Sequence, residues 1–183
     1  ELAAAVEREA GREGHLLITA SAEGDPERET ALVAELLARQ VDGLVVVPAG
    51  VGVTGHRTWG APVVYVDRPG SDESADNVLS DNAGGIRAAV EHLAARGHRR
   101  IGFLGDDPSY WTAQERERAF RATHADLRFV GTPSVAMAPY TPESLADVLT
   151  RWTTGLDPVT ALVTGNNRVT VAMLRAVRRL GTN

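Results

Sequence analysis

Short apolar runs alternate with amphipathic stretches along most of this 183-residue chain, and this alternation limits the possible folds more than any other feature. The clearest unit is Ser80–Asp107. Ile86, Val90 and Leu93 recur there at the spacing of one helix face. After a glycine, the apolar run Ile101–Leu104 has the length of a buried strand. This stretch therefore predicts a helix followed by a strand.

The ends of this helix carry residues that begin and end helices. Asp81 or Asn82 can cap its start, because a short side-chain oxygen accepts hydrogen bonds from the unpaired amides of the first turn. Gly97 suits the left-handed position after the last turn. A cluster of basic residues surrounds this end: Arg96, His98, Arg99 and Arg100. We interpret the cluster as capping and not as a phosphate site, because the negative end of a helix repels anions.

The same kinds of pattern occur in the rest of the chain. Further helices are predicted over residues 1–12, 27–39, 112–123 and 169–180, and another starts within 140–144, with Pro142 in its first turn and apolar positions at 145, 148, 149 and 152. Strands are predicted over 16–20, 44–47, 63–66, 135–138 and 160–164. Val-rich strands without polar interruptions are typical of parallel sheets that helices cover on both faces. We therefore predict an α/β fold with doubly wound parallel sheets.

Composition excludes several classes of protein. The chain has no cysteine, so it can form neither a disulfide nor a cysteine-ligated zinc site. A net charge of -5 argues against this chain binding a nucleic-acid backbone by itself, since such binding depends on clustered Lys and Arg. No apolar run approaches the roughly 20 residues that cross a bilayer, so we expect no transmembrane segment. The five histidines lack metal-ligand spacing, and no metal site is predicted.

One glycine motif has the spacing of a dinucleotide-binding site. Gly50, Gly52 and Gly55 match the G-x-G-x-x-G fingerprint of dinucleotide-binding proteins. That fingerprint works only where its last glycine opens a helix, and no helix pattern follows Gly55. We therefore predict no cofactor. We find no pairing of nucleophile and base, no His-Glu-x-x-His and no Gly-Lys-Ser/Thr loop, so no catalytic residue is predicted either.

Asp67 and Arg68 directly follow the predicted strand 63–66. In open parallel sheets, ligands bind beyond the carboxyl ends of strands, so this pair stands where a polar ligand would bind. A turn that carries a surface ion pair explains the two residues equally well. The sequence leaves both interpretations open.

The order of these signals resembles the effector-binding core of LacI/GalR-family transcription regulators, which is itself similar to periplasmic sugar-binding proteins. The resemblance covers nearly the whole chain and rests on several motifs together: VDGL at 41–44, VDRP at 66–69, VEHLAARGHRRI at 90–101, AQERERAF at 113–120 and TGNN at 164–167. It implies two α/β lobes of the type I periplasmic-binding-protein-like fold, incomplete at both ends. Residues 1–80 would form the N-terminal lobe and 81–183 the C-terminal lobe.

The resemblance also implies partners. A small effector, sugar-like or nucleoside-like, would bind between the lobes of a cytoplasmic protein that does not contact membranes. Operator DNA would be read by a helix-turn-helix headpiece that is absent from this chain. A homodimer would form through the helix that contains Leu2 and Val6 and through helix 27–39, unless their apolar faces pack on the sheet instead.

Residues of the family's ligand site can be matched individually. Arg116 matches the arginine that reaches into the cleft, where its planar donors suit hydroxyls or a carboxylate; replacing it by Ala should abolish effector binding and leave the fold intact. The alternative is a solvated helix arginine like Arg118. Asn166 matches the asparagine that bonds effector hydroxyls. The family usually has aspartate next, and Asn167 removes that charge.

Three further residues match positions of the family's ligand site. Tyr110 and Thr112 match loop positions beside the ligand, and Tyr140 matches an aromatic that stacks on the bound ring or, alternatively, staples the start of a helix. Asp81 is a cap or hinge residue, with ligand contact as the alternative. The predicted ligand-binding set is Asp67, Asp81, Tyr110, Thr112, Arg116, Tyr140 and Asn166.

The sequence predicts the effector-sensing and dimerising core of a DNA-binding regulator. The alternative is a periplasmic sugar-binding protein of a transport system, which the same two lobes would serve. A nucleotide-dependent sugar enzyme is a weaker interpretation, because the chain shows none of the catalytic motifs that such an enzyme needs.

Overall fold

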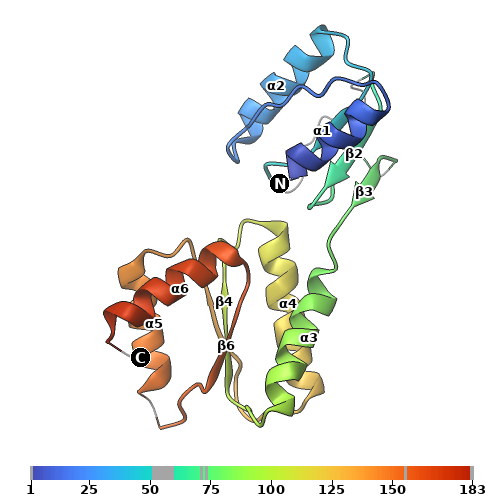
Figure 1. The fold of residues 1–183 in the computed structure, drawn as a ribbon. Coiled ribbons are helices and arrows are strands. Elements are labelled where there is room, and N and C mark those ends of the chain that lie inside the picture. Colours follow the sequence, from blue (N-terminus) through green and yellow to red (C-terminus); the bar gives the residue numbers. More distant parts are fainter. Residues whose placement is uncertain (1, 51–59, 71, 73, 155, 182–183) are drawn as a thin grey trace. The chain divides into compact units, whose positions relative to one another are not determined.

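The computed structural model describes residues 2–50, 60–70, 72, 74–154 and 156–181. The chain divides into two compact units, Glu1–Asn77 and Val78–Asn183, which Figure 1 shows as ribbons. Each unit is an α/β structure in its own right, and assigning the two to the lobes of an effector core stays a prediction. Two glycines of the dinucleotide-like motif, Gly52 and Gly55, lie outside the described residues.

The described residues of unit 1 form two helices and a three-stranded sheet in the order β1-β2-β3, whose last strand ends one residue into unit 2. β1 and β2 are parallel, with Leu44 opposite Val63. Helix α2 places Val33 against a small core that includes Leu44 and the fully buried Tyr65. The elements are α1 (Leu2–Arg12), α2 (Pro26–Ala38), β1 (Leu44–Val46), β2 (Val63–Val66) and β3 (Asp76–Val78). The short polar strand β3 was not predicted.

Two expectations for unit 1 are wrong. Residues 16–20 are not a strand, and Leu16 is 89% exposed and Ile18 50% exposed. The sheet of the described residues ends at β1, so this segment has no hydrogen-bonded neighbour. Strand β1 is covered on one face only, with Val45 51% exposed, because α2 packs on one side and α1 buries no residue. An apolar run becomes a buried strand only where a second layer covers it.

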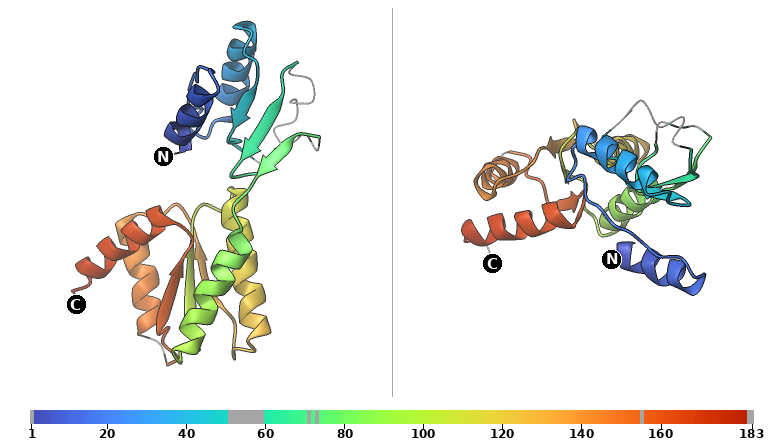
Figure 2. Two further views of the ribbon diagram at one scale, coloured as in Figure 1. Left: turned by 45° about the vertical axis from the view of Figure 1, so that its right-hand side comes forward. Right: turned by 90° about the horizontal axis from the view of Figure 1, so that it is seen from above.

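Unit 2 is a three-layer sandwich. Its sheet has the order β5-β4-β6 with all strands parallel, and every residue of the central β4 is buried. Figure 2 shows this sheet between one pair of helices, α3 and α4, and a second pair, α5 and α6. The elements are α3 (Asn82–Ala95), β4 (Ile101–Gly105), α4 (Trp111–Asp126), β5 (Ser134–Met137), α5 (Pro142–Thr153), β6 (Ala161–Thr164) and α6 (Asn167–Arg179). The predicted doubly wound parallel α/β fold is confirmed.

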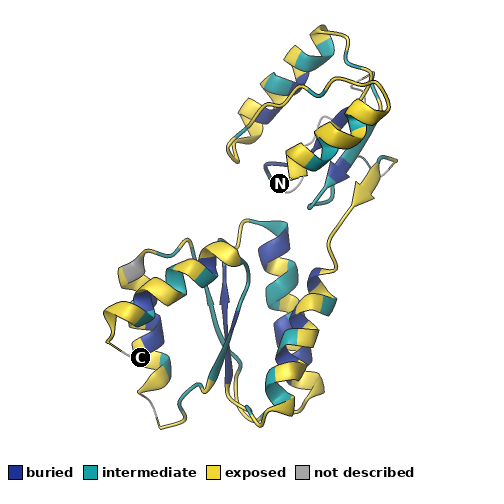
Figure 3. Ribbon diagram, viewed as in Figure 1, coloured by how far each residue is buried: buried dark blue, intermediate teal, exposed yellow. Residues whose placement is uncertain are grey.

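Successive residues of β4 serve two separate cores. Phe103 stacks on Phe120 of α4, with ring centroids 5.2 Å apart, in the core on the α3–α4 side. Leu104 points the other way and packs with Leu145 of α5 and Val169 of α6. Figure 3 shows the whole strand in the colour of buried residues. Alternation of side chains across a strand makes one apolar run fill both cores.

The caps predicted for α3 are confirmed. Asp81 is the N-cap, and its Oδ1 accepts a hydrogen bond of 2.8 Å from the Gly84 amide. Gly97 has φ of +93°, the left-handed conformation that follows a helix end. Arg99 donates to the carbonyl oxygen of Ala94 at 2.6 Å. The basic cluster therefore includes a cation that satisfies a helix carbonyl, which supports its interpretation as capping.

Two neighbouring glycines in α3 allow a matched test of this cap. A Cβ built on Gly84 would lie 2.1 Å from Asp81 Oδ2, whereas one on Gly85 meets nothing within 4 Å. Gly85→Ala should stabilise the protein by about 0.5–1 kcal/mol, while Gly84→Ala should gain nothing, because displacing the cap costs about 1 kcal/mol. Urea unfolding of both variants measures the difference. Equal gains would show that the Asp81 cap contributes no stability.

Burial of His124 should make unit 2 sensitive to acid. Its ring is 7% exposed and lies edge-on to Phe129, and burial lowers the pKa of His124 from its ordinary value of 6.5. As pH falls through 6.5 the unfolded chain takes up the proton first, so the free energy of unfolding should fall below about pH 7. Urea unfolding at several pH values should show a shallower decline in His124→Gln. The exposed His15→Gln is the control, and a decline that is unchanged in His124→Gln would contradict the prediction.

Candidate functional site

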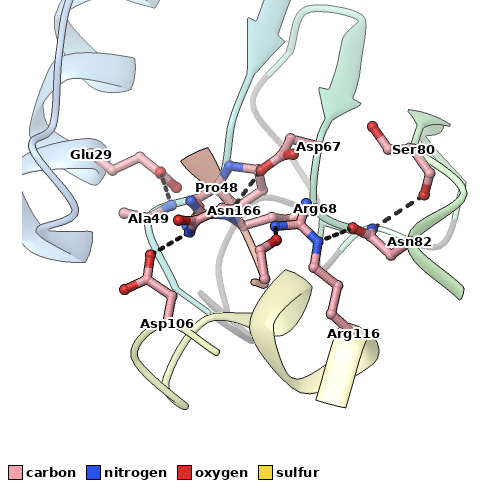
Figure 4. Close-up of polar contacts among 11 residues, drawn as sticks. Glu29, Pro48, Ala49, Asp67, Arg68, Ser80, Asn82, Asp106, Arg116 and Asn166 are labelled. Atoms are coloured by element: carbon pink, nitrogen blue, oxygen red, sulfur yellow. Dashed lines mark hydrogen bonds and ion pairs between the residues drawn. The ribbon is translucent and has the colours of Figure 1, made fainter. Parts of the chain in front are cut away.

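Polar side chains gather where the three strands of unit 2 end. Asp106 follows β4, Tyr140 lies three residues beyond β5, and Asn166 lies two residues beyond β6. Because these strands are parallel, their carboxyl ends lie at one edge of the sheet. This is the edge at which α/β proteins bind ligands. We call it the unit 2 edge, and Figure 4 shows its polar contacts.

Arg116 is fixed at this edge by two hydrogen bonds. Its Nε donates to Asn82 Oδ1 at 2.6 Å, and its Nη1 donates to the Gly165 carbonyl oxygen at 2.8 Å. Arg118, two residues further along α4, has a side chain that is 68% exposed and pairs with Glu115 of the same helix. Arg116 is therefore a half-buried, positioned arginine and not a solvated one like Arg118. The remaining N–H groups of its guanidinium are available to another acceptor.

Asn166 is held on both sides of its amide. Its Oδ1 accepts from the Val169 amide at 2.9 Å, which caps α6. Its Nδ2 donates to Asp106 Oδ2 at 2.6 Å. The other carboxylate oxygen of Asp106 accepts from the amide of Asp107 at 2.9 Å. An amide keeps one N–H and one lone pair beyond these bonds, so Asn166 can still donate and accept once each.

Tyr140 has a buried hydroxyl that forms no hydrogen bond with the described residues. Burial, with the charge of Asp106 as a second cause, raises the pKa of Tyr140 to about 12. The phenol therefore stays protonated near neutral pH and can donate. Its ring packs against the cluster that contains Leu145, and Tyr140 and Leu145 stand at the N′ and N4 positions of α5, as in a hydrophobic staple. Stacking on a ligand stays a prediction.

The other predicted residues of unit 2 lie at helix starts. Tyr110 occupies the N-cap position of α4 without a side-chain capping bond, and Thr112 is 8% exposed in the first turn. Asp81 caps α3, and Asn167 is exposed at the start of α6. The ligand roles of Tyr110, Thr112 and Asp81 stay predictions.

Two side chains of the unit 2 edge were missed in the sequence. Asn82 is 8% exposed, and it receives the Arg116 bond while its own Nδ2 donates to Ser80. Asp106 bonds Asn166 across 60 positions of sequence. The signal that singled out Asp67, an acid directly after an apolar strand, is present at Asp106 as well. Applied to every strand, it would have found this residue.

Unit 1 has a polar network of its own at its strand ends. Arg68 donates from Nη1 to the Pro48 carbonyl oxygen at 3.0 Å and pairs with Asp67 at 3.3 Å. Asp67 has φ of +70°, a strained conformation for a residue other than glycine. The buried Glu29 accepts from the Ala49 amide at 2.6 Å. Burial raises the pKa of Glu29, and the Ala49 bond and the charge of Arg68 oppose that rise.

The predicted ion pair of Asp67 and Arg68 is therefore present, in a half-buried network that joins α2 to the ends of β1 and β2. A ligand role for Asp67 stays a prediction. Across the described ranges, no group of three or more His, Asp or Glu side chains is arranged to hold a metal ion. Among the same residues, none of the helices has the length and apolar character that a membrane crossing requires.

Comparison with known proteins identifies the family. The model of the periplasmic-binding-protein-like domain matches residues 90–183, just over half of the chain. A solved structure from Burkholderia thailandensis, described as a ribose operon repressor, has 32% sequence identity and a TM-score of 0.81. The match covers 100% of this chain and 69% of that one. The chain belongs to the periplasmic-binding-protein-like domains of the LacI/GalR family.

Other relatives of this periplasmic-binding-protein-like domain agree. The transcriptional regulator EndR of Paenibacillus polymyxa is 35% identical over 107 residues, which are 57% of this chain and 32% of EndR. A periplasmic binding protein/LacI transcriptional regulator of Alkaliphilus metalliredigens, solved with D-xylulofuranose, has a TM-score of 0.83 at 18% identity and supports the fold alone; the match covers 100% of this chain and 67% of that one.

The chain spans 32% and 39% of the length of two of the curated relatives it matches. The names of these relatives favour a regulator over a transport protein. The predicted family resemblance is confirmed.

The contacts of Arg116 revise the expectation that Arg116→Ala leaves the fold intact. Because the guanidinium satisfies the buried amide of Asn82, Arg116→Ala should lower the free energy of unfolding by about 1–3 kcal/mol. Arg118→Ala, which removes an exposed pair, should cost less than about 0.5 kcal/mol. Urea unfolding measures both, and Asn82→Ala combined with Arg116→Ala should cost less than the sum of the single variants. Strict additivity would show that the two side chains act independently.

Proposed function

We propose that this chain is the effector-sensing core of a LacI/GalR-type transcription regulator and that the unit 2 edge binds a small polyhydroxylated ligand. One observation carries the proposal. Arg116 and Asn166 are both held in place at the carboxyl end of a parallel sheet, and both keep unused hydrogen-bonding groups. Side chains that are already positioned lose little conformational freedom when a ligand binds.

The chemistry of the edge favours hydroxyl groups as ligands. Arg116 offers only donors, Asp106 offers only acceptors, and Asn166 offers one of each. A hydroxyl both donates and accepts, so it can satisfy either kind of neighbour. Sugars and nucleosides carry several such groups on a compact ring. They are the ligand class that this mixture of donors and acceptors recognises best.

The relatives supply specific probes for this class. One similar structure is described as a ribose operon repressor, and another was solved with D-xylulofuranose. Pentoses are therefore the first ligands to try, followed by hexoses and nucleosides. A catalytic role is not part of the proposal, since the relatives are named as regulators.

The proposed mechanism is a shift between two conformations of the regulator. An effector changes this equilibrium only if it binds one conformation more tightly than the other. The shift would alter the spacing of two DNA-binding headpieces that lie outside this chain, on operator half-sites at a fixed distance. The dimer that carries them would be cytoplasmic, and we propose α1, with Leu2 46% exposed, as part of its surface.

Calorimetry with the full-length protein tests the binding site. D-ribose, D-xylulose, D-fructose and adenosine are the probes, and at least one should bind. Arg116→Lys keeps a charge but loses the planar fork, so it should weaken binding roughly 30-fold or more. The exposed Arg118→Lys is the matched control and should bind like the wild type. Equal affinity of Arg116→Lys and wild type would show that the ligand does not use this edge.

A footprinting experiment addresses regulation separately. The full-length protein should protect a palindromic DNA site, and the probe that binds in calorimetry should change that protection. Protection that does not respond to the bound probe would contradict the sensor role, even if the binding site is correct.

A further inference from the structure

Asp106 is a carboxylate that is bonded to Asn166, a predicted ligand residue of the unit 2 edge. Its Oδ2 receives the Asn166 amide at 2.6 Å, and its Oδ1 receives the Asp107 amide at 2.9 Å. The first bond joins the end of β4 to the loop after β6, as Figure 4 shows, and the second holds the carboxylate against the backbone of the next residue. Two hydrogen bonds therefore hold the carboxylate in one orientation, unlike that of a freely rotating surface acid.

The buried hydroxyl of Tyr140 is the second observation. It forms no hydrogen bond with any described residue, although an unsatisfied buried hydroxyl costs free energy. Asp106 is close enough for its charge to help keep this phenol protonated. The charge of Asp106 therefore acts on its neighbours at the unit 2 edge. Asp106 keeps lone pairs beyond its two bonds, so a ligand hydroxyl at this edge can donate to it.

We propose that Asp106 positions Asn166 and makes the unit 2 edge select neutral polyhydroxylated ligands over anionic ones, an inference that rests on the proposed function. An ionised carboxylate or phosphate has no proton to give Asp106 and is repelled by its charge. Arg116 alone would attract such anions. Asp106 cancels that attraction at the same edge, so a sugar phosphate binds less well than the corresponding sugar.

Calorimetry on the full-length protein tests the selection. The probes are D-ribose against ribose 5-phosphate and D-fructose against fructose 1-phosphate, with wild type and Asp106→Asn. Asn keeps one acceptor oxygen, which can serve Asn166, but it removes the charge and the second acceptor that receives the Asp107 amide. We expect the ratio of sugar to sugar-phosphate affinity to fall roughly tenfold or more in Asp106→Asn. Asp147→Asn removes an exposed acid of α5 and is the control for net charge, with the ratio unchanged.

A second measurement needs no ligand. In nuclear magnetic resonance spectra, the side-chain amide protons of Asn166 should exchange slowly in wild type and in Asp106→Asn, which restores the acceptor. They should exchange at least several times faster in Asp106→Ala, where the acceptor is gone. Because Asn has the shape of Asp, the test of packing is Asp106→Leu, which fills the space without an acceptor: a purely packing role would keep the exchange slow in this variant, whereas the hydrogen-bonding role predicts fast exchange.

The outcomes separate this inference from the function on which it rests. If the sugars bind and the affinity ratio is the same in wild type and Asp106→Asn, the selection by Asp106 is wrong while the binding site stands. If the ratio falls equally in Asp147→Asn, net charge and not position is responsible, and the inference is overturned. If no probe binds, the proposed function fails for these ligands, and an Asn166 amide that exchanges equally in Asp106→Ala would still overturn the positioning role.

Discussion

The guanidinium of Arg116 joins three segments of unit 2 that are far apart in the sequence. It lies on α4 and donates to Asn82 at the start of α3 and to Gly165 after β6. The two bonds span 34 and 49 positions of sequence, and the acceptor on Asn82 is buried. Charge-assisted bonds to a partly buried acceptor are among the stronger hydrogen bonds in a protein. Arg116 therefore ties α4 to the start of α3 and to the loop after β6.

The local signals of the sequence were sufficient for unit 2. Helical spacing, capping residues and strand-length apolar runs identified α3 and β4 to within a residue or two. Such signals work here because every strand of unit 2 has a covering helix on each side, so pattern and burial agree. At residues 16–20 the same apolar pattern failed. No described strand pairs with that segment, and hydrophobicity alone does not supply a partner.

The sequence pointed to candidate residues that can be recognised one at a time. It missed residues whose role depends on a contact with a residue far away in the sequence. Arg116 and Asn166 were predicted because they match ligand positions in the motifs of the LacI/GalR family. Asn82 and Asp106 were missed as partners, because each contacts a residue 34 or 60 positions away. Spacing within one sequence reports on neighbours along a helix or strand and not on contacts between loops at a sheet edge. The topology of parallel strands is what brings these loops together.

The bonds at the unit 2 edge restrict what a ligand can do there. Asn166 already gives one N–H to Asp106 and one lone pair to the cap of α6, so it can bond a ligand only once in each sense. Arg116 likewise keeps only the donors that Asn82 and Gly165 leave. Since each side chain is held before any ligand arrives, binding costs little conformational entropy. The unused donors and acceptors, however, have fixed directions. A ligand must match those directions. The same contacts that stabilise the fold of unit 2 therefore define which small molecules its edge can recognise.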